Sequence, residues 1–126
     1  MTWPDVGTPI VVVPVGSCEQ HGPHLPLATD TTIATELVKA LVARRPDCVA
    51  APPITVSASG EHAGFPGTLS IGTSVMTDVI VELARSADWA GGVVFVNGHG
   101  GNHTAMSSPL PGTTSATIET SSPPTS

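Results

Sequence analysis

Three short apolar runs, separated by two stretches of helical periodicity, constrain the fold of this chain more than any other feature. The runs cover residues 9–15 (PIVVVPV), 48–56 (CVAAPPITV) and 91–98 (GGVVFVNG). Their length, their β-branched residues and the turn residues beside them predict buried strands, the second of them interrupted by two prolines. Between the runs, residues 29–45 and 74–90 carry apolar side chains at helical spacing and predict two helices.

The order strand, helix, strand, helix, strand predicts an α/β fold with a parallel, doubly wound sheet and helices on both of its faces. The apolar positions that we expect to face the sheet are Ile33, Leu37, Val38, Leu41 and Val42 in the first helix and Val75, Val79, Leu83 and Ala87 in the second. Ligands of such sheets bind outside the carboxyl ends of the strands. The first and third strands run directly into polar, histidine-bearing loops, so we expect both loops at one edge of the sheet.

The last twenty residues lack this pattern. Residues 107–126 contain six Ser, five Thr and four Pro, with Glu119 as the single charged side chain. This composition predicts a disordered tail. We therefore expect residues 1–106 to form the N-terminal part of a folded domain, followed by the tail at 107–126.

The charge balance excludes some classes of partner. Four basic and ten acidic residues give a formal net charge of −6, which argues against binding to nucleic acid or to anionic membrane surfaces. No apolar run approaches the roughly 20 residues of a membrane-spanning helix, and the first residues lack the features of a signal peptide. We expect a cytoplasmic protein in which the isolated Cys18 and Cys48 are free thiols.

The loop after the first strand, residues 16–30 (GSCEQHGPHLPLATD), concentrates ionisable side chains. Glu19 and His21 are two residues apart and point to the same side in an extended segment. Asp30 stands at the start of the predicted helix, and His99 follows the third strand. Carboxylate oxygens and imidazole nitrogens in this combination suit Zn²⁺, Mn²⁺ or Fe²⁺, and a carboxylate such as Asp30 can bridge two ions. The predicted metal ligands are Glu19, His21, Asp30 and His99.

Each of these residues also has a purely structural interpretation. Asp30 could cap its helix, Glu19 could be a solvated loop charge, and His21 or His24 could be hydrogen-bonded structural histidines. The glycine-rich segment 97–102 (NGHGGN) could be a simple turn, or a loop whose backbone comes close to a ligand. Its spacing does not match a phosphate-binding loop.

The segment 57–72 (SASGEHAGFPGTLSIG) supplies further candidates. Glu61 and His62 are possible catalytic or substrate-side groups, with a polar surface loop as the alternative. Phe65 and Pro66 could line the wall of a pocket. Cys18 could be a nucleophile paired with a histidine, although a thiol that only packs is the preferred interpretation. His24 and His103 receive no role.

Three segments, VVVPVGSCEQHGPHLPLATD, GEHAGFPGTLS and VVFVNGHGGN, resemble in order the N-terminal signature blocks of the creatininase (creatinine amidohydrolase) family. The resemblance covers about residues 8–104. It implies an α/β fold, a divalent metal centre (Zn, Fe or Mn), often with two ions, and hydrolysis of C–N bonds in peptides or small amides. It matches Glu19, His21, Asp30 and His99 to the family's metal ligands, with Asp30 as the bridging carboxylate. It also implies that full-length relatives are homo-oligomers.

Within the family, the opening TWPDV and the first block most resemble members that remove a C-terminal dipeptide from a modified precursor peptide during redox-cofactor biosynthesis. Two departures stand out. Creatininase has a glutamate two residues after the histidine matched by His99, where this chain has Gly101. Family members are also longer and carry a His-Ala-Gly-Glu-type block that this sequence lacks, so we expect a chain truncated at its C-terminus. The alternatives are a creatinine- or formamide-type amidohydrolase, or an inactive fragment that keeps part of the metal site.

Overall fold

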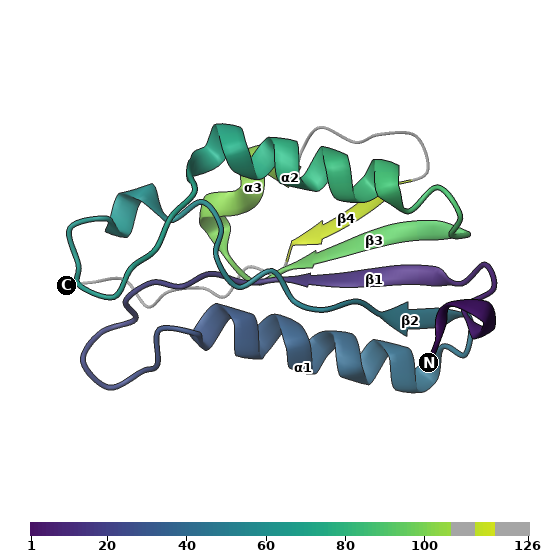
Figure 1. Ribbon diagram of the computed structural model, residues 1–126. Helices are drawn as coiled ribbons and strands as arrows, with labels where there is room; N and C mark the ends of the chain where they lie inside the picture. Colours follow the sequence, from purple (N-terminus) through teal and green to yellow (C-terminus); the bar gives the residue numbers. More distant parts are fainter. Residues whose placement is uncertain (107–112, 118–126) are drawn as a thin grey trace.

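The computed structural model describes residues 1–106 and 113–117, and its described part is a parallel sheet covered by helices on both faces (Figure 1). The strands are β1 (Ile10–Val15), β2 (Cys48–Ala50), β3 (Gly92–Asn97) and β4 (Thr113–Thr117), in the order β2-β1-β3-β4. The helices are α1 (Thr29–Arg44), α2 (Gly72–Ser86) and the short α3 (His103–Met106), with 3₁₀ turns η1 (Trp3–Asp5), η2 (Gly60–His62) and η3 (Gly100–Asn102). The predicted α/β fold is confirmed.

The strand order creates a switch point between β1 and β3. Helix α1 connects β1 to β2 along one face of the sheet, and α2 connects β2 to β3 along the other face (Figure 1). The register pairs Val15 at the end of β1 with Asn97 at the end of β3. The two following segments therefore start side by side and leave toward opposite faces, which opens the crevice where ligands of such sheets bind.

Alternate side chains of the strands fill two separate cores. Val11, Val13 and Val15 of β1 lie in the cluster that also contains residues of α2 and α3, whereas Val12 lies in the cluster of α1. Successive strand residues point to opposite faces. Because both faces are covered, the central strands are hydrophobic at almost every position, as the sequence indicated.

The helix faces match the prediction only in part. In α2, Val79 and Ala87 pack against the core as predicted, whereas Val75 and Leu83 are 51% and 38% exposed. The most deeply buried positions are Met76 and Ile80, one residue away from the predicted stripe. Apolar residues stand at neighbouring positions in this helix, so two stripes fit the helical period, and contact with the sheet selects one of them. In α1, Val38 is buried as predicted, while Leu37 is 39% exposed.

The second strand is short, as its prolines predicted. Strand β2 ends at Ala50, and its line resumes only as a single bridge between Ile54 and Val15. Proline has no backbone N–H to donate and interrupts a ladder. After this interruption the chain continues into residues 57–70, which lie next to the carboxyl end of β1. The hydrogen bond from Leu69 N to the carbonyl oxygen of Cys18 (2.9 Å) joins the two segments.

The expected disordered tail needs a correction over Thr113–Thr117, which forms β4. This strand pairs in parallel with β3, from Val93 opposite Thr113 to Asn97 opposite Thr117. Without β4, β3 would be the edge strand and would offer unpaired backbone groups to a neighbour, and threonine is compatible with strands. Composition alone does not show such pairing. The rest of the predicted tail, 107–112 and 118–126, lies outside the described residues.

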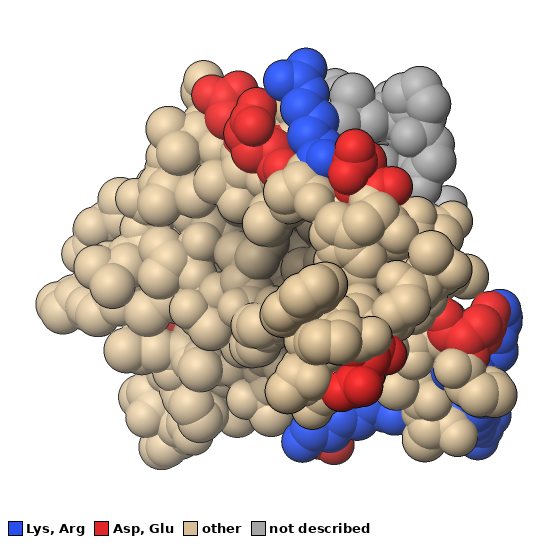
Figure 2. All heavy atoms as spheres, turned by 45° about the vertical axis from the view of Figure 1, so that its right-hand side comes forward, with Lys and Arg blue, Asp and Glu red and all other residues tan. Residues whose placement is uncertain are grey.

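Charged side chains on the surface occur in small mixed groups. On the face drawn in Figure 2, basic side chains lie beside acidic ones, and a wide area between these groups carries no charge. The exposed ion pairs are Lys39–Glu36, Arg45–Asp47 and Arg85–Glu82. No helix among the described residues is long and apolar enough to cross a bilayer.

Candidate metal centre

All four predicted metal ligands meet at the carboxyl ends of β1 and β3. The segment after β1 supplies Glu19 and His21, the first turn of α1 supplies Asp30, and the segment after β3 supplies His99. His99 Nδ1 lies 2.9 Å from Glu19 Oε1 and 3.1 Å from Asp30 Oδ2. His21 Nε2 lies 2.9 Å from Asp30 Oδ1. The two oxygens of Asp30 thus face different histidines.

The structural interpretations of the two carboxylates do not hold. The N-cap of α1 is Ala28, so Asp30 lies in the first turn and is not the cap. Its Oδ2 accepts a hydrogen bond from Ser17 Oγ (2.8 Å), and the side chain is buried. Glu19 is 3% exposed and is not a solvated loop charge. Both carboxylates are withdrawn from water and turned toward histidines.

Backbone carbonyl groups fix which nitrogen of each histidine faces the carboxylates. His99 Nε2 lies 2.9 Å from the carbonyl oxygen of Ala58, and His21 Nδ1 lies 3.1 Å from that of Glu19. A carbonyl oxygen only accepts, so these nitrogens carry the proton in neutral rings. The lone pairs of His99 Nδ1 and His21 Nε2 then point at carboxylate oxygens, an arrangement that needs a cation or a proton between them. Metal-binding histidines are oriented in this way.

A buried oxygen without a partner gives a second reason to expect a cation. Glu19 Oε2 is buried and makes no hydrogen bond among the described residues. A buried acceptor left unpaired is costly. Glu19, His21 and Asp30 each offer a ligand atom, and these atoms all lie within 4.8 Å of one another. This set of nitrogen and oxygen donors fits Zn²⁺, Mn²⁺ or Fe²⁺.

The pKa values show how the cluster behaves without a metal ion. The pKa of Glu19 is raised, because burial and the neighbouring Asp30 together outweigh the charges of His99 and His62, which lower it. Burial would also raise the pKa of Asp30, but hydrogen bonds with His99 and Ser17 outweigh it and lower that pKa to about 2. The pKa of His99 is raised, because its hydrogen bond to Asp30 and the charge of Glu19 outweigh burial. The cluster therefore favours holding a proton where a cation would otherwise lie.

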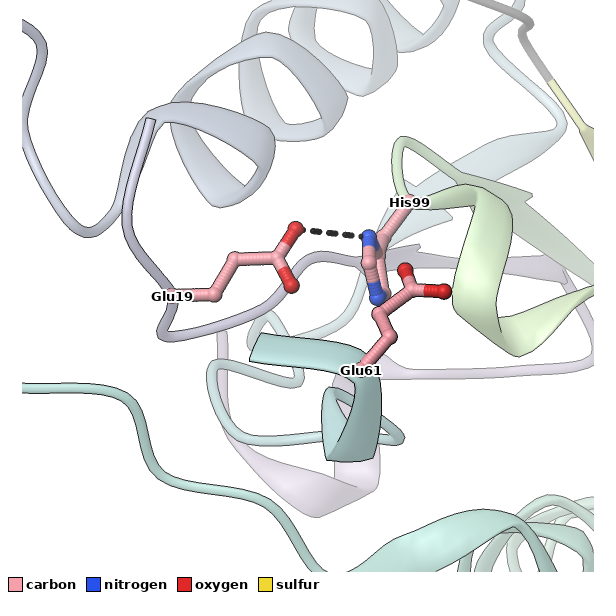
Figure 3. Close-up of side chains that lie close together, drawn as sticks. All are labelled: Glu19, Glu61 and His99. Carbon is pink, nitrogen blue, oxygen red and sulfur yellow. Dashed lines mark ion pairs between the residues drawn. The ribbon is translucent and has the colours of Figure 1, made fainter. Parts of the chain in front are cut away.

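A second group of possible ligand atoms consists of Glu19, Glu61 and His99, whose ligand atoms also lie within 4.8 Å of one another. Figure 3 shows that Glu19 and Glu61 approach the His99 ring from different elements. Glu61 is exposed and belongs to η2. Its neighbour His62 places Nε2 3.5 Å from Glu61 Oε1 and 3.5 Å from Glu19 Oε2. The structure therefore brings both candidate catalytic residues to the edge of the centre.

The other predicted candidates lie farther from the chemistry. His24 is exposed and belongs to neither group of ligand atoms. Phe65 and Pro66 are exposed, although the Phe65 ring lies near the His62 ring, with centroids 6.3 Å apart. Cys18 Sγ donates to the carbonyl oxygen of Gly67 (3.4 Å), a contact that joins two loops and gives no support for a nucleophile. The side chain of His103 is outside the described part.

Cys18 and Cys48 are both free, as predicted.

Two buried asparagines, Asn97 and Asn102, shape the glycine-rich segment. Asn97 Oδ1 accepts from the backbone N–H of His99 (3.1 Å), and Asn97 Nδ2 donates to the carbonyl oxygen of His99 (2.8 Å). Asn102 Oδ1 accepts from the N–H of Ala58 (3.0 Å), whose carbonyl oxygen holds the His99 ring. The buried asparagines thus fix the backbone on both sides of His99.

Sequence reasoning missed two residues that orient the site. Ser17 donates to Asp30, and Gln20 contacts His62 Nδ1 through its Nε2 atom at 3.0 Å. Both residues stand in the first polar loop, close to Glu19. Their chemistry gave no signal, because a serine and a glutamine in a loop are ordinary and their partners become neighbours only in the folded chain.

The comparisons with known proteins agree with this architecture. The family model described as creatinine amidohydrolase matches residues 1–117. The mycofactocin precursor peptide peptidase of Mycolicibacterium smegmatis is 55% identical over an alignment of 104 residues, and the match covers 78% of this chain and 42% of that protein. This agrees with the precursor-peptidase resemblance of the first loop. The chain spans less than half the length of the curated precursor peptidases that it matches.

Solved structures show the same relationship. A creatininase structure designated Mn is 31% identical with a TM-score of 0.69, and the match covers 83% of this chain and 46% of that one. A creatininase mutant of the Zn-Zn type is 26% identical with a TM-score of 0.74, covering 83% of this chain and 45% of that one. The family model spans all described residues and includes every element of the candidate centre. The chain therefore belongs to the creatininase family.

Proposed function

We propose that this chain forms the metal-binding part of an amidohydrolase, with Glu19, His21, Asp30 and His99 as the ligands. The observation that carries the proposal is the orientation of His21 and His99. Both rings turn lone pairs toward buried carboxylates, while their other nitrogens are held by backbone carbonyl groups. A divalent metal ion held by such ligands polarises a carbonyl oxygen and lowers the pKa of water, which is the chemistry that amide hydrolysis needs.

This donor set would hold two ions, with Asp30 offering one oxygen toward each histidine. Asp30 Oδ1 faces His21 and Asp30 Oδ2 faces His99, so one carboxylate serves both sides. Glu61 supplies a carboxylate on the His99 side, where this chain has Gly101 in place of the glutamate of creatininase. Zn²⁺, Fe²⁺ and Mn²⁺ all suit these ligands, and solved creatininases designated Mn and Zn-Zn support that range.

The substrate that we propose is the mycofactocin precursor peptide, cleaved at the peptide bond that precedes its C-terminal dipeptide. The support is the 55% identity to a protein of that name over 104 residues. Creatinine or a formamide is the alternative, and the description of the family model supports creatinine. The free cysteines support a reducing compartment such as the cytoplasm.

The test combines metal content with cleavage. The chain is stripped with a chelator, reloaded with Zn²⁺, Mn²⁺ or Fe²⁺, and incubated with a synthetic peptide that carries the C-terminus of the precursor. We expect bound metal and dipeptide release, with both lost in His99→Ala and retained in His24→Ala, which alters an exposed histidine outside the centre. Metal uptake without cleavage would support the centre but contradict catalysis by this chain, as expected of an inactive fragment. Failure to bind any of the metals would refute the proposal.

A further inference from the structure

His62 turns a protonated ring nitrogen toward the site, whereas His21 and His99 turn unprotonated nitrogens toward it. Gln20 determines the proton position of His62. The backbone N–H of Gly22 lies 2.8 Å from Gln20 Oε1. A backbone N–H can only donate, so the amide atom at that position must be the oxygen. The amide nitrogen of Gln20 therefore faces His62 Nδ1, at 3.0 Å. An amide NH₂ only donates, so Nδ1 of the neutral His62 ring accepts, and the ring proton is on Nε2.

The proton on His62 Nε2 is not used by the residues around it. Its two carboxylate neighbours, Glu19 Oε2 and Glu61 Oε1, are each 3.5 Å away. Direct N–H···O hydrogen bonds have heavy-atom distances of about 2.7–3.2 Å. The His62 side chain is 27% exposed, so a molecule that enters from solvent can reach this N–H.

The placement of His62 is built from two loops that are joined to each other. Gln20 lies between the ligands Glu19 and His21 in the sequence, and His62 lies in η2. The loops are joined by the hydrogen bond from Leu69 N to the carbonyl oxygen of Cys18 (2.9 Å), and beside it Gln20 N makes a longer contact with Thr68 Oγ1 (3.4 Å). The donor is thus held in place before any ligand arrives, as in a preorganised site.

From this geometry we infer that His62 is a hydrogen-bond donor to a carbonyl oxygen of the bound amide substrate, and that Gln20 is the residue that positions it. A neutral acceptor fits because Glu19 and Glu61 border the N–H and disfavour an anion. The identity of the substrate rests on the proposed function. The assignment of the proton to Nε2 does not, since it follows from the bonds of Gln20 alone. His62 thereby takes a role other than that of a metal ligand.

The proton position can be measured directly. In ¹⁵N-histidine-labelled, metal-free protein at about pH 8, where imidazoles are mostly neutral, long-range ¹H–¹⁵N spectra report the tautomer of each ring. We expect the Nε2–H form for His62, assigned by the signal that disappears in His62→Gln. In Gln20→Glu, a carboxylate accepts from Nδ1–H, so His62 is expected to change to the Nδ1–H form. An Nδ1–H form in the wild-type chain would overturn the inference.

Metal content and substrate affinity test the role of the donor. His62→Phe and His62→Gln should both bind as much metal as the wild type, because His62 is not a ligand. His62→Phe is expected to bind the synthetic peptide about tenfold more weakly, as expected for one lost hydrogen bond. His62→Gln, which keeps an N–H donor, should recover part of that loss, and the matched variant His24→Phe should bind normally.

Three results separate the possible failures. Loss of bound metal in His62→Phe would make His62 a ligand and overturn the inference. Equal peptide affinity in His62→Phe and the wild type would overturn the donor role. A wild-type chain with the expected tautomer that binds metal but no amide substrate would contradict the proposed substrate, and with it the role of His62 toward that substrate.

Discussion

Glu19, Asp30 and His99 give the metal-free protein a pH-dependent stability with contributions of opposite sign. The pKa of Asp30 falls from 3.8 to about 2 in the folded chain, so its contribution is fully present above pH 3.8 and is lost as the pH falls toward 2. The pKa values of Glu19 and His99 are raised above 4.5 and 6.5. Their contributions are therefore present below those values and are lost as the pH rises through the folded-state pKa values.

We predict that the metal-free protein is most stable in acidic solution, between the ordinary pKa values of Asp30 (3.8) and Glu19 (4.5), because only there are all three contributions fully present. The free energy of unfolding that is lost in acid through protonation of Asp30 amounts to roughly 2 kcal/mol. This loss should be absent in Asp30→Asn. Urea unfolding in the presence of a chelator, across the pH range, measures the loss of stability at low pH and at high pH. Saturation with metal should reduce the loss at high pH, because the cation replaces the proton. A stability profile that is flat on both sides would contradict this assignment.

Glu61 provides a prediction about the number of ions. If its carboxylate completes a second site with Glu19 and His99, Glu61→Gln should lower the metal content from two ions to one at moderate metal concentration. Elemental analysis after gel filtration measures this ratio. Glu82→Gln is the matched control, because Glu82 is an exposed residue of α2 that pairs with Arg85. Equal metal content in the two variants would exclude Glu61 as a ligand.

At the level of secondary-structure elements, the site depends on how closely the end of β3 approaches α1. A Cβ atom added to Gly98 would lie 2.7 Å from the carbonyl oxygen of Asp30 and 3.3 Å from Ala34 Cβ. Ala34 is fully buried at this contact. The small residues Gly98 and Ala34 thus allow the first turn of α1 to lie beside the segment that carries His99.

We predict that Gly98→Ala destabilises the fold by about 1–3 kcal/mol, the range for overpacked sites, and also weakens metal binding. The added methyl group must displace the backbone of α1, which moves Asp30 away from His99. Chemical unfolding and metal titration measure the two effects. Gly100→Ala is the control, since a Cβ atom there meets nothing within 4 Å. If the two variants behave alike, close contact at Gly98 does not position the ligands.

The elements that could be predicted from the sequence are those whose formation depends on local residue patterns. The strands β1 and β3 and the helix α1 have strong local patterns, and their bounds agree with the prediction to within one or two residues. The buried face of α2 depended on contact with the sheet, because Met76 and Val75 are equally apolar. Strand β4 depended on a neighbour, since its threonines and serine carry no hydrophobic alternation.

The candidate site divides in the same way. The four ligands could be proposed because Glu19, His21 and His99 follow strand ends, where parallel sheets bind ligands. Their grouping in the folded chain agrees with that proposal. The contact between Gln20 and His62 could not be proposed, because the two residues are 42 positions apart in the sequence. Their loops come together only in the folded chain. Hydrogen bonds between loops depend on the path of the whole chain.

For the whole molecule, the metal centre is a crosslink between segments that are distant in sequence. Glu19 and His21 follow β1, Asp30 starts α1, and His99 follows β3. The same chain regions enclose the two hydrophobic cores. A cation that binds only the folded state stabilises that state by RT ln(1 + [metal]/Kd), about 2.7 kcal/mol when the free metal concentration is 100 times Kd. Metal binding and folding are therefore coupled across the chain.

We predict that Zn²⁺ or Mn²⁺ raises the midpoint of thermal unfolding of this chain by about 10–20 °C at that saturation, given roughly 4–8 °C per kcal/mol for a domain of 60–100 residues. Circular dichroism in the near and far ultraviolet should report one coincident transition, and a chelator should restore the lower midpoint. His99→Ala should lose the shift, and His24→Ala should keep it. A midpoint that does not respond to any of the metals, or a shift that survives in His99→Ala, would show that these four residues do not hold the ion.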